Sequence, residues 1–310
     1  MCADTVYNYA INKKSAYAEI RKEENIMKKI LSLILASLML VCAFASCSKA
    51  SAGVKVIDIE LTKEEYAFGV DKTQPELLEK VNTFIDKIMA DGTFDDICNH
   101  YFGDGEPVGV KSAALDASKA DQQLVVATNA AFEPFEYTND GGSTYYGIDM
   151  EIAALLAEEL GMELVISNMD FDAVCLSVGQ QKCDIAMAGL TVKPDREEHV
   201  TFSKSYYNAA QKLIVKADDT TFDACKTADD VTAILNGYDN TVKIGVQNGT
   251  TGQFYVQGDA DWGFDGFKTE CKGYANGSLA VNDLINGNIN FVIIDSAPAT
   301  CIADAYNAMN

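Results

Sequence analysis

The chain has 310 residues, 48% of them apolar, and a net charge of −22. This length can supply one large or two medium-sized hydrophobic cores. The acidic balance repels nucleic acids and anionic lipids, so neither is expected as a partner, and the charge alone indicates nothing beyond solubility.

The segment that begins at Met27 has the composition of an export signal. Two lysines precede an apolar run over 30–44 that is too short and too rich in Ser and Ala for a comfortable membrane span. Small residues then precede Cys47, which predicts a lipoprotein cleavage site with Cys47 as the lipidated N-terminus. Cleavage elsewhere is the alternative. Residues 1–46 are assigned to the signal and to upstream sequence, with translation starting at Met1 or at Met27.

Residues 54–102 resemble the C-terminal part of a folded domain, although they come first after the predicted signal segment. Residues 54–72 contain two β-rich runs, and 75–102 contain two amphipathic helices. Residues 103–123 are small and polar without a sustained period, which indicates a linker.

Strands and helices alternate from residue 124 onward. Short continuous apolar runs, typical of parallel strands buried on both faces, alternate with segments of helical period and predict a βαβαβ unit. Its runs are 124–128, 147–162, 163–167, 171–180 and 184–189. A second series comprises 243–247, 248–252 with a following helix, 267–271, 278–288, 291–295 and 297–307. Two α/β lobes, joined through 205–219, are therefore predicted.

Nine cysteines are present, and the six beyond Cys47 lack the C-x-x-C spacing of a zinc or redox site. No metal site is predicted. Buried free thiols are the default interpretation, and a disulfide between Cys175 and Cys183 is the alternative.

Ligands of open α/β sheets bind beyond the carboxyl ends of the strands, so the loops there hold the candidate site residues. After 185–188, Ala188 and Gly189 permit close backbone approach, Thr191 offers a hydroxyl, and Arg196 offers a planar fork suited to a carboxylate. Arg196 could equally be a surface residue at a helix start.

Two further strand ends carry polar groups. Beyond Gln247, Thr250 or Thr251 could present N–H groups to an anion or could merely cap a helix. The turn is too short for a phosphate loop and lacks its lysine. Asp295 could pair with an ammonium group or cap the last helix.

Aromatic side chains near the first strand complete the candidate site. Phe132, Phe135 and Phe171 could form its walls, with Asn129 beside them, or could belong to the core. One cation, one helix N-terminus, one carboxylate and several aromatic faces match a zwitterion, which is the charge pattern of an amino acid.

The motifs that carry these residues resemble a known family. LVVATNAAFEPFEY, GIDMEIAALLAEELGM, DIAMAGLTVKPDREEHVTFSKSYYNAAQKLIV, IGVQNGTTG and FVIIDSAPA closely resemble extracellular solute-binding proteins of family 3, the receptors of polar amino-acid ABC transporters. Within that family, the chain resembles the glutamine and basic amino-acid receptors. The resemblance implies a two-lobe, type II periplasmic-binding-protein-like α/β fold that closes on a free amino acid, with no catalytic residue and no cofactor.

The resemblance also implies residue roles. Arg196 matches the arginine for the ligand α-carboxylate, with Thr191 and the Thr251 N–H beside it. Asp295 matches the partner of the α-ammonium group, helped by the Gly189 carbonyl. The implied ligand-binding residues are Asn129, Phe132, Phe171, Ala188, Gly189, Thr191, Arg196, Gln247, Thr250, Thr251 and Asp295.

The ligand side chain is less defined. Asn129 departs from the aspartate that many receptors for basic amino acids have there, which favours a neutral, glutamine-like ligand and leaves arginine and lysine as alternatives. The expected partners are that amino acid and an ABC permease. The expected state is a monomer, exported and held by its lipid at the outer face of the cytoplasmic membrane.

Compared with the family, the order of the chain is changed. The segments matching 54–72 and 75–102 follow the last helix in family members, whereas here they precede the first lobe. This predicts a circular permutant, with a second lobe of 53–67 plus 208–310 and a first lobe of 68–207 that includes the linker about 103–123. A fragment of a tandem fusion and a strand swapped between two chains are the alternatives.

Two functional alternatives belong to other classes. Cyclohexadienyl (arogenate) dehydratases share this fold, but they need a positioned general acid, for which only Asp295 is available. A chemoreceptor-type sensor is disfavoured because no kinase, methyl-accepting or membrane-spanning region is recognised.

Overall fold

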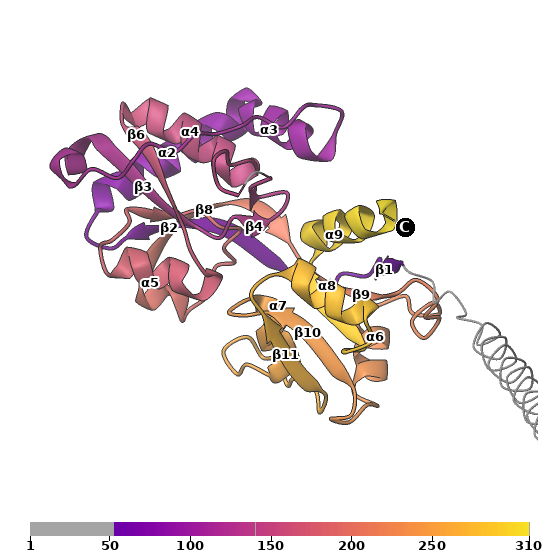
Figure 1. Ribbon diagram of the computed structural model, residues 1–310. Helices are drawn as coiled ribbons and strands as arrows, with labels where there is room; N and C mark the ends of the chain where they lie inside the picture. The colour runs from indigo at the N-terminus through magenta and orange to yellow at the C-terminus, as the bar shows by residue number, and fades with distance from the viewer. Residues whose placement is uncertain (1–52, 140, 310) are drawn as a thin grey trace, which may run out of the picture. The chain divides into compact units, whose positions relative to one another are not determined.

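The computed structural model describes residues 53–139 and 141–309, which fold around two five-stranded sheets (Figure 1). The sheet of the first lobe has the strand order β6-β3-β7-β2-β8. Its strands are β2 (Glu64–Asp71), β3 (Gln123–Thr128), β6 (Glu163–Asn168), β7 (Ile185–Ala186) and β8 (Val200–Ala209). The first lobe also contains the helices α2 (Pro75–Asp91), α3 (Thr93–Phe102), α4 (Ile148–Leu160) and α5 (Val174–Gly179), the 3₁₀ turns η1 (Ala117–Gln122), η2 (Phe171–Ala173) and η3 (Arg196–Glu198), and a hairpin of β4 (Ala131–Phe132) and β5 (Glu136–Tyr137).

The sheet of the second lobe has the order β1-β9-β12-β10-β11. Its strands are β1 (Val54–Ile57), β9 (Gln211–Lys216), β10 (Lys243–Gln247), β11 (Glu270–Tyr274) and β12 (Phe291–Asp295). Its helices are α6 (Ala228–Leu235), α7 (Thr251–Gln257), α8 (Gly277–Ile285) and α9 (Ser296–Ala308). The predicted two-lobe α/β architecture is confirmed.

The two sheets share one pattern of strand directions. In the first lobe β3 is parallel to β6 and β7, then β2 is antiparallel to β7, and β8 is antiparallel to β2. In the second lobe β10 is parallel to β11 and β12, then β9 is antiparallel to β12, and β1 is antiparallel to β9. The carboxyl ends of three parallel strands therefore meet at one edge of each sheet.

Apolar spacing explains how the helices cover these sheets. In α2 the buried residues Val81, Phe84, Ile85 and Ile88 fall on one face at helical spacing. The helix ends where Gly92 adopts φ +89°, a left-handed conformation that glycine tolerates without strain. The apolar face of α2 packs against the first-lobe sheet, on β8 and β2.

The chain crosses between the lobes twice, from β1 to β2 and from β8 to β9. The two crossings lie side by side, since the Leu61 N–H donates to the Gln211 carbonyl at 2.9 Å. Two adjacent extended segments of this kind can serve as a hinge.

The first described strand lies beside the last helix. β1 pairs with β9 in the register Val54↔Lys216 to Ile57↔Leu213. The Asn307 side chain accepts from the Val54 N–H at 3.0 Å and donates to the Val54 carbonyl at 2.9 Å. The permutation hypothesis requires this pairing within the second-lobe sheet, and the hypothesis remains a proposal.

The predicted linker runs along the first lobe. Val110 forms a β-bridge with Tyr145, and the Ala113 N–H donates to the Leu164 carbonyl at 2.8 Å. The segment ends in η1, directly before β3.

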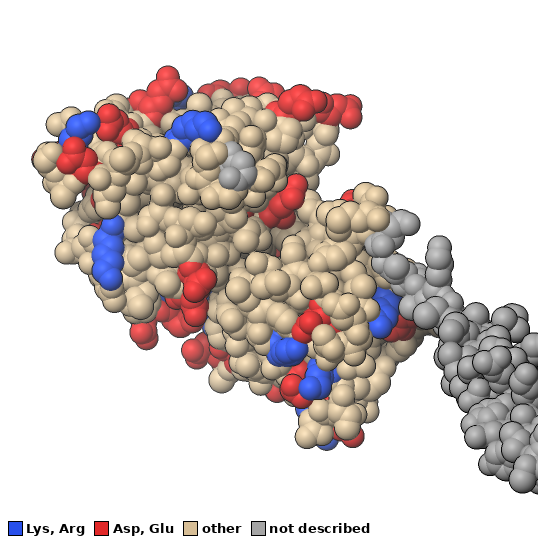
Figure 2. Space-filling model, in the orientation of Figure 1, with Lys and Arg blue, Asp and Glu red and all other residues tan. Residues whose placement is uncertain are grey.

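Acidic side chains are spread over the visible face of the protein, with few basic ones between them (Figure 2). No helix in the described ranges is long and apolar enough to span a membrane. The predicted signal and Cys47 lie outside the described residues.

Candidate ligand-binding site

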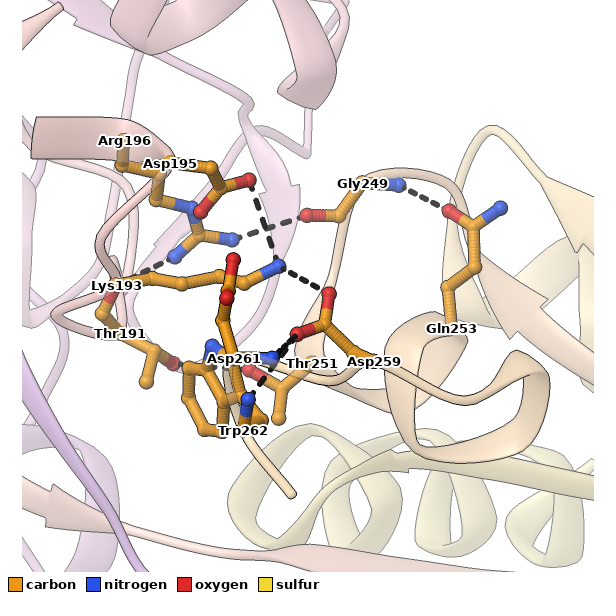
Figure 3. A network of polar contacts seen from close by, with 10 residues as sticks. All are labelled: Thr191, Lys193, Asp195, Arg196, Gly249, Thr251, Gln253, Asp259, Asp261 and Trp262. Carbon is orange, nitrogen blue, oxygen red and sulfur yellow. Dashed lines mark hydrogen bonds and ion pairs between the residues drawn. The ribbon is translucent and has the colours of Figure 1, made fainter. Parts of the chain in front are cut away.

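Arg196, at the start of η3 in the first lobe, is buried and reaches the second lobe. Its guanidinium group donates to the Thr191 carbonyl at 2.7 Å and to the Gly249 carbonyl at 3.0 Å (Figure 3). Its Cζ atom lies 5.1 Å from the centroid of the Phe171 ring. A guanidinium group has five N–H donors, so three remain for a ligand carboxylate.

Two threonines of the predicted set meet between the lobes. The Thr251 hydroxyl lies 3.4 Å from the Thr191 hydroxyl, and both residues are buried. Thr191 donates to the Glu64 carboxylate at 2.7 Å. α7 begins at Thr251, while the Thr250 hydroxyl turns back to the Gln247 carbonyl at 2.8 Å instead of capping the helix.

Asp295 ends β12 and is almost fully buried. Its carboxylate accepts from the Tyr66 hydroxyl, a first-lobe residue, at 2.6 Å. Burial, and secondarily the nearby Glu64 carboxylate, raise the pKa of Asp295 to about 7. A cation placed here would favour the ionised form of Asp295.

Gly189 follows β7 in a left-handed conformation with φ +53°. Its N–H donates to the buried carboxylate of Asp149 at 2.9 Å, and Tyr206 donates to the other oxygen of that carboxylate at 2.6 Å. A side chain at position 189 would meet the Phe132 ring at 2.9 Å. Glycine is therefore required both by its φ angle and by the approach of Phe132.

Asn129 and Gln247 form an amide pair between the lobes. The Asn129 Nδ2 donates to the Met169 carbonyl at 2.7 Å, and Gln247 Nε2 donates to the Asn129 Oδ1 at 3.1 Å. Gln247 Oε1 is buried and has no hydrogen-bond partner among the described residues. This oxygen could accept an N–H from a ligand.

The remaining predicted residues have different surroundings. Phe132 stacks on Phe135 with ring centroids 6.0 Å apart, and Phe171 faces Arg196. Ala188 is fully buried in an apolar cluster with Val174 and Leu190. The structure thus brings the polar predicted residues to the facing edges of the two sheets and places Ala188 in the core behind them.

Several charged residues of this region were not predicted. Glu64 accepts from the Thr62 hydroxyl at 2.6 Å and from Gln211 Nε2 at 3.0 Å, in addition to Thr191. Glu136 is fully buried, and neither of its carboxylate oxygens has a hydrogen-bond partner among the described residues. Burial is the main cause that raises the pKa of Glu136, and the nearby Asp149 and Asp295 carboxylates raise it further. Glu64 was not predicted because it lies far from the other candidate site residues in the sequence.

Lys193 was also not predicted. Its ammonium group lies 3.2 Å from Asp259 of the second lobe and 3.4 Å from Asp195 (Figure 3). The sequence did not indicate that Lys193 is buried and paired, because its acidic partner in the second lobe, Asp259, is distant in sequence.

The six cysteines in the described ranges are free, and Cys175, Cys183 and Cys225 are buried. Burial raises the pKa of the Cys175 and Cys183 thiols, which keeps them in the neutral form. No group of three or more His, Cys, Asp or Glu side chains in these ranges could hold a metal ion.

Known proteins similar to this chain are amino-acid-binding proteins. The chain is 33% identical over 107 residues to an arginine-binding extracellular protein of Bacillus subtilis, covering 34% of this chain and 41% of that one. It is 30% identical to a putative ABC transporter arginine-binding protein of Escherichia coli, covering 59% and 68%. The chain spans less than two thirds of the B. subtilis relative and 64% of an arginine-binding periplasmic protein of Mannheimia haemolytica.

Solved structures agree. The arginine-bound form of truncated ArgBP from T. maritima matches with 31% identity and a TM-score of 0.50, covering 62% of this chain and 82% of that one. An ancestral amino acid-binding protein, described as a precursor of cyclohexadienyl dehydratase, matches with 28% identity and a TM-score of 0.51, covering 60% and 76%. The model of the bacterial extracellular solute-binding proteins, family 3, matches residues 124–287, and this chain belongs to that family.

Proposed function

We propose that this protein binds a free amino acid between its two lobes and delivers it to an ABC permease. The observation that carries the proposal is the pair of buried, oppositely charged groups at the facing sheet edges: Arg196 in the first lobe and Asp295 in the second. They complement an α-carboxylate and an α-ammonium group. We further propose that a lipid on Cys47 holds the protein, as a monomer, at the outer face of the cytoplasmic membrane.

Closure of the lobes supplies the mechanism. Arg196, Asp295 and the Thr191–Thr251 pair all have a partner across the lobes. A ligand between them gains contacts in the closed state that the open state lacks, and this difference shifts the population toward closure. The permease then recognises the closed form.

The side-chain end of the site favours a neutral ligand with hydrogen-bond donors. Asn129 presents an amide instead of a carboxylate, and the buried Gln247 Oε1 is an unused acceptor. A glutamine side chain offers N–H donors to such an acceptor. Arginine is the second candidate, favoured by the relatives named for arginine and by the acidic residue Glu64 near the site.

A thermal-shift panel of the twenty amino acids tests the proposal, because a ligand stabilises the folded state according to its own affinity. Glutamine should raise the melting temperature most. Stabilisation by arginine and lysine without glutamine would contradict the neutral-ligand proposal, and no shift with any amino acid would contradict amino-acid binding.

A dehydratase is the alternative function, supported by the likeness to a precursor of cyclohexadienyl dehydratase and by raised pKa values in buried carboxyl groups. Burial raises the pKa of Asp295 to about 7, so a carboxyl group at the facing sheet edges can hold a proton near neutral pH, as a general acid must. A turnover assay with prephenate and arogenate separates the functions: measurable product would overturn the binding-protein proposal.

A further inference from the structure

We propose that Lys193 and Asp259 form a latch between the lobes that holds the closed state and slows ligand release. The proposal rests on the proposed function in one respect, since it assumes that the lobes open and close around a ligand. The latch comprises Lys193 of the first lobe and Asp259, Phe254 and Trp262 of the second. Figure 3 shows Lys193 beside Asp259 and Trp262.

Lys193 is buried to an unusual degree for a lysine. Its side chain is 3% exposed, and its ammonium group lies 3.1 Å from the Phe254 ring centroid and 5.9 Å from that of Trp262. Lysine is almost never fully buried unless its charge is paired. Here the partners are Asp259 at 3.2 Å and Asp195 at 3.4 Å.

Most of these partners belong to the other lobe. Asp195 is two residues from Lys193, and its side chain is 51% exposed, so this pair persists whether the lobes are open or closed. Phe254 lies in α7 of the second lobe, and Asp259 lies just after that helix. Separation of the lobes would take both away from the ammonium group, so the cation–π contact with Phe254 and the ion pair with Asp259 require the closed state.

The surface that receives Lys193 is rigid. Asp259 Oδ1 accepts from the N–H groups of Asp261 and Trp262, both at 3.1 Å, which leaves Oδ2 for the lysine. The backbones of Asp259 and Phe264 exchange two hydrogen bonds of 2.9 Å. Rings of Tyr255 and Phe264 pack edge to face at 5.2 Å. The loop therefore presents its carboxylate in a fixed position, and closure costs little further ordering.

The latch is adjacent to the ligand site but separate from it. Lys193 lies between Thr191 and Arg196 in one short loop, so lobe closure brings the Lys193–Asp259 and Arg196–Gly249 contacts into place together. A latch outside the ligand site changes the closed-state population and therefore the affinity for any ligand by the same factor.

The experiment uses the purified full-length protein with Lys193→Met, Asp259→Asn and the double variant. Methionine keeps the packing on Phe254, and asparagine keeps the Oδ1 acceptor that fixes the loop. The matched control is Lys272→Met, because Lys272 pairs with Asp283 at 2.7 Å and lies 5.1 Å from the Tyr274 ring centroid within the second lobe alone.

The first readout needs no ligand. Trp262 is the only tryptophan of the chain, so acrylamide quenching of its fluorescence reports on the latch. Small-angle scattering reports lobe opening independently. Both latch variants should show stronger quenching and a larger radius of gyration, while Lys272→Met stays like the wild type. Unchanged scattering in both latch variants would overturn the latch.

The second readout is stopped-flow dissociation of glutamine and of arginine. Each single latch variant should release ligand about 10-fold faster, the order of effect of one desolvated ion-pair or cation–π contact, and the double variant should be no faster than the singles. Additive effects in the double variant would refute a shared contact. If none of the twenty amino acids binds the wild type, the proposed function fails, while the scattering result still decides the latch.

Discussion

Asp295→Asn separates ligand recognition from stability, because the two should change in opposite directions. The Asp295 carboxylate is buried and accepts from Tyr66, and the Glu64 and Glu136 carboxyl groups lie near enough to interact with it. Asparagine keeps an acceptor for Tyr66 and removes the charge. The variant should therefore bind ligand poorly and fold more stably.

The magnitude follows from the pKa. Burial raises the pKa of Asp295 from 3.8 to about 7, which is equivalent to ~4 kcal/mol against ionisation. Between pH 4 and pH 7 the folded state holds more protons than the unfolded state, so this group lowers the free energy of unfolding as pH rises through that window. Asparagine cannot ionise, so the variant avoids this loss of stability. We expect its free energy of unfolding at pH 8 to exceed that of the wild type by about 1–2 kcal/mol, after the cost of burying the amide.

Ligand binding has the opposite dependence. An ammonium group favours the ionised carboxylate, so binding below pH 7 should release a proton from Asp295, and wild-type affinity should rise up to ~10-fold per pH unit between pH 5 and pH 7. In Asp295→Asn this slope should be lost, with affinity at pH 8 reduced ~10- to 100-fold for one charged hydrogen bond.

Calorimetry in two buffers of different ionisation enthalpy counts the released protons, and urea unfolding at pH 5 and pH 8 gives the stabilities. Asp58→Asn is the control, since the Asp58 side chain is 94% exposed. A wild-type affinity that does not change between pH 5 and pH 7, or an Asp295→Asn protein that keeps the slope, would refute the reasoning.

Three further changes test other parts of the structure. Arg196→Lys keeps the charge but loses the planar fork, so calorimetry should show ~10- to 100-fold weaker binding; undiminished affinity would contradict its role. Gly189→Ala forces a left-handed alanine against Phe132, and chemical denaturation should show a loss of ~1–3 kcal/mol; an unchanged midpoint would be contrary to this packing. Asn307→Ala removes both bonds to Val54 and should cost ~1–2 kcal/mol, which denaturation also measures; no loss would show that these bonds do not stabilise the sheet.

The sequence predicted the two-lobe architecture, and it named as candidates most of the polar residues that the structure brings to the facing edges of the two sheets. Short apolar runs marked the parallel strands, and the carboxyl edge of a parallel sheet is where its loops must present ligands. That rule made Arg196, Thr251 and Asp295 candidates, although they come from three different strand ends, and the resemblance to the family then implied their roles.

What the sequence did not predict depends on contacts between residues that are far apart in the sequence. Glu64 and Tyr66 lie in β2, but they meet Thr191 and Asp295, more than a hundred residues away. Buried charge is equally invisible, because Lys193 and Glu136 resemble surface residues until their surroundings are known. No local spacing encodes such contacts.

The shared strand pattern of the two sheets gives the permutation proposal a physical basis. In each lobe three parallel strands are followed across the sheet by β2 or β9, a strand that enters from the other lobe. In the first lobe the chain runs from β7 through η3 to the edge strand β8 and then crosses to β9. The equivalent path in the second lobe would run from β12 through α9 to the edge strand β1 and then cross to β2. One link of that path, from α9 to β1, is not made by the chain, and there the two hydrogen bonds between Val54 and Asn307 hold its sides together. A chain cut at this link and rejoined through residues 103–123 keeps every strand pairing and both crossings, so the hinge and the site survive the change of order.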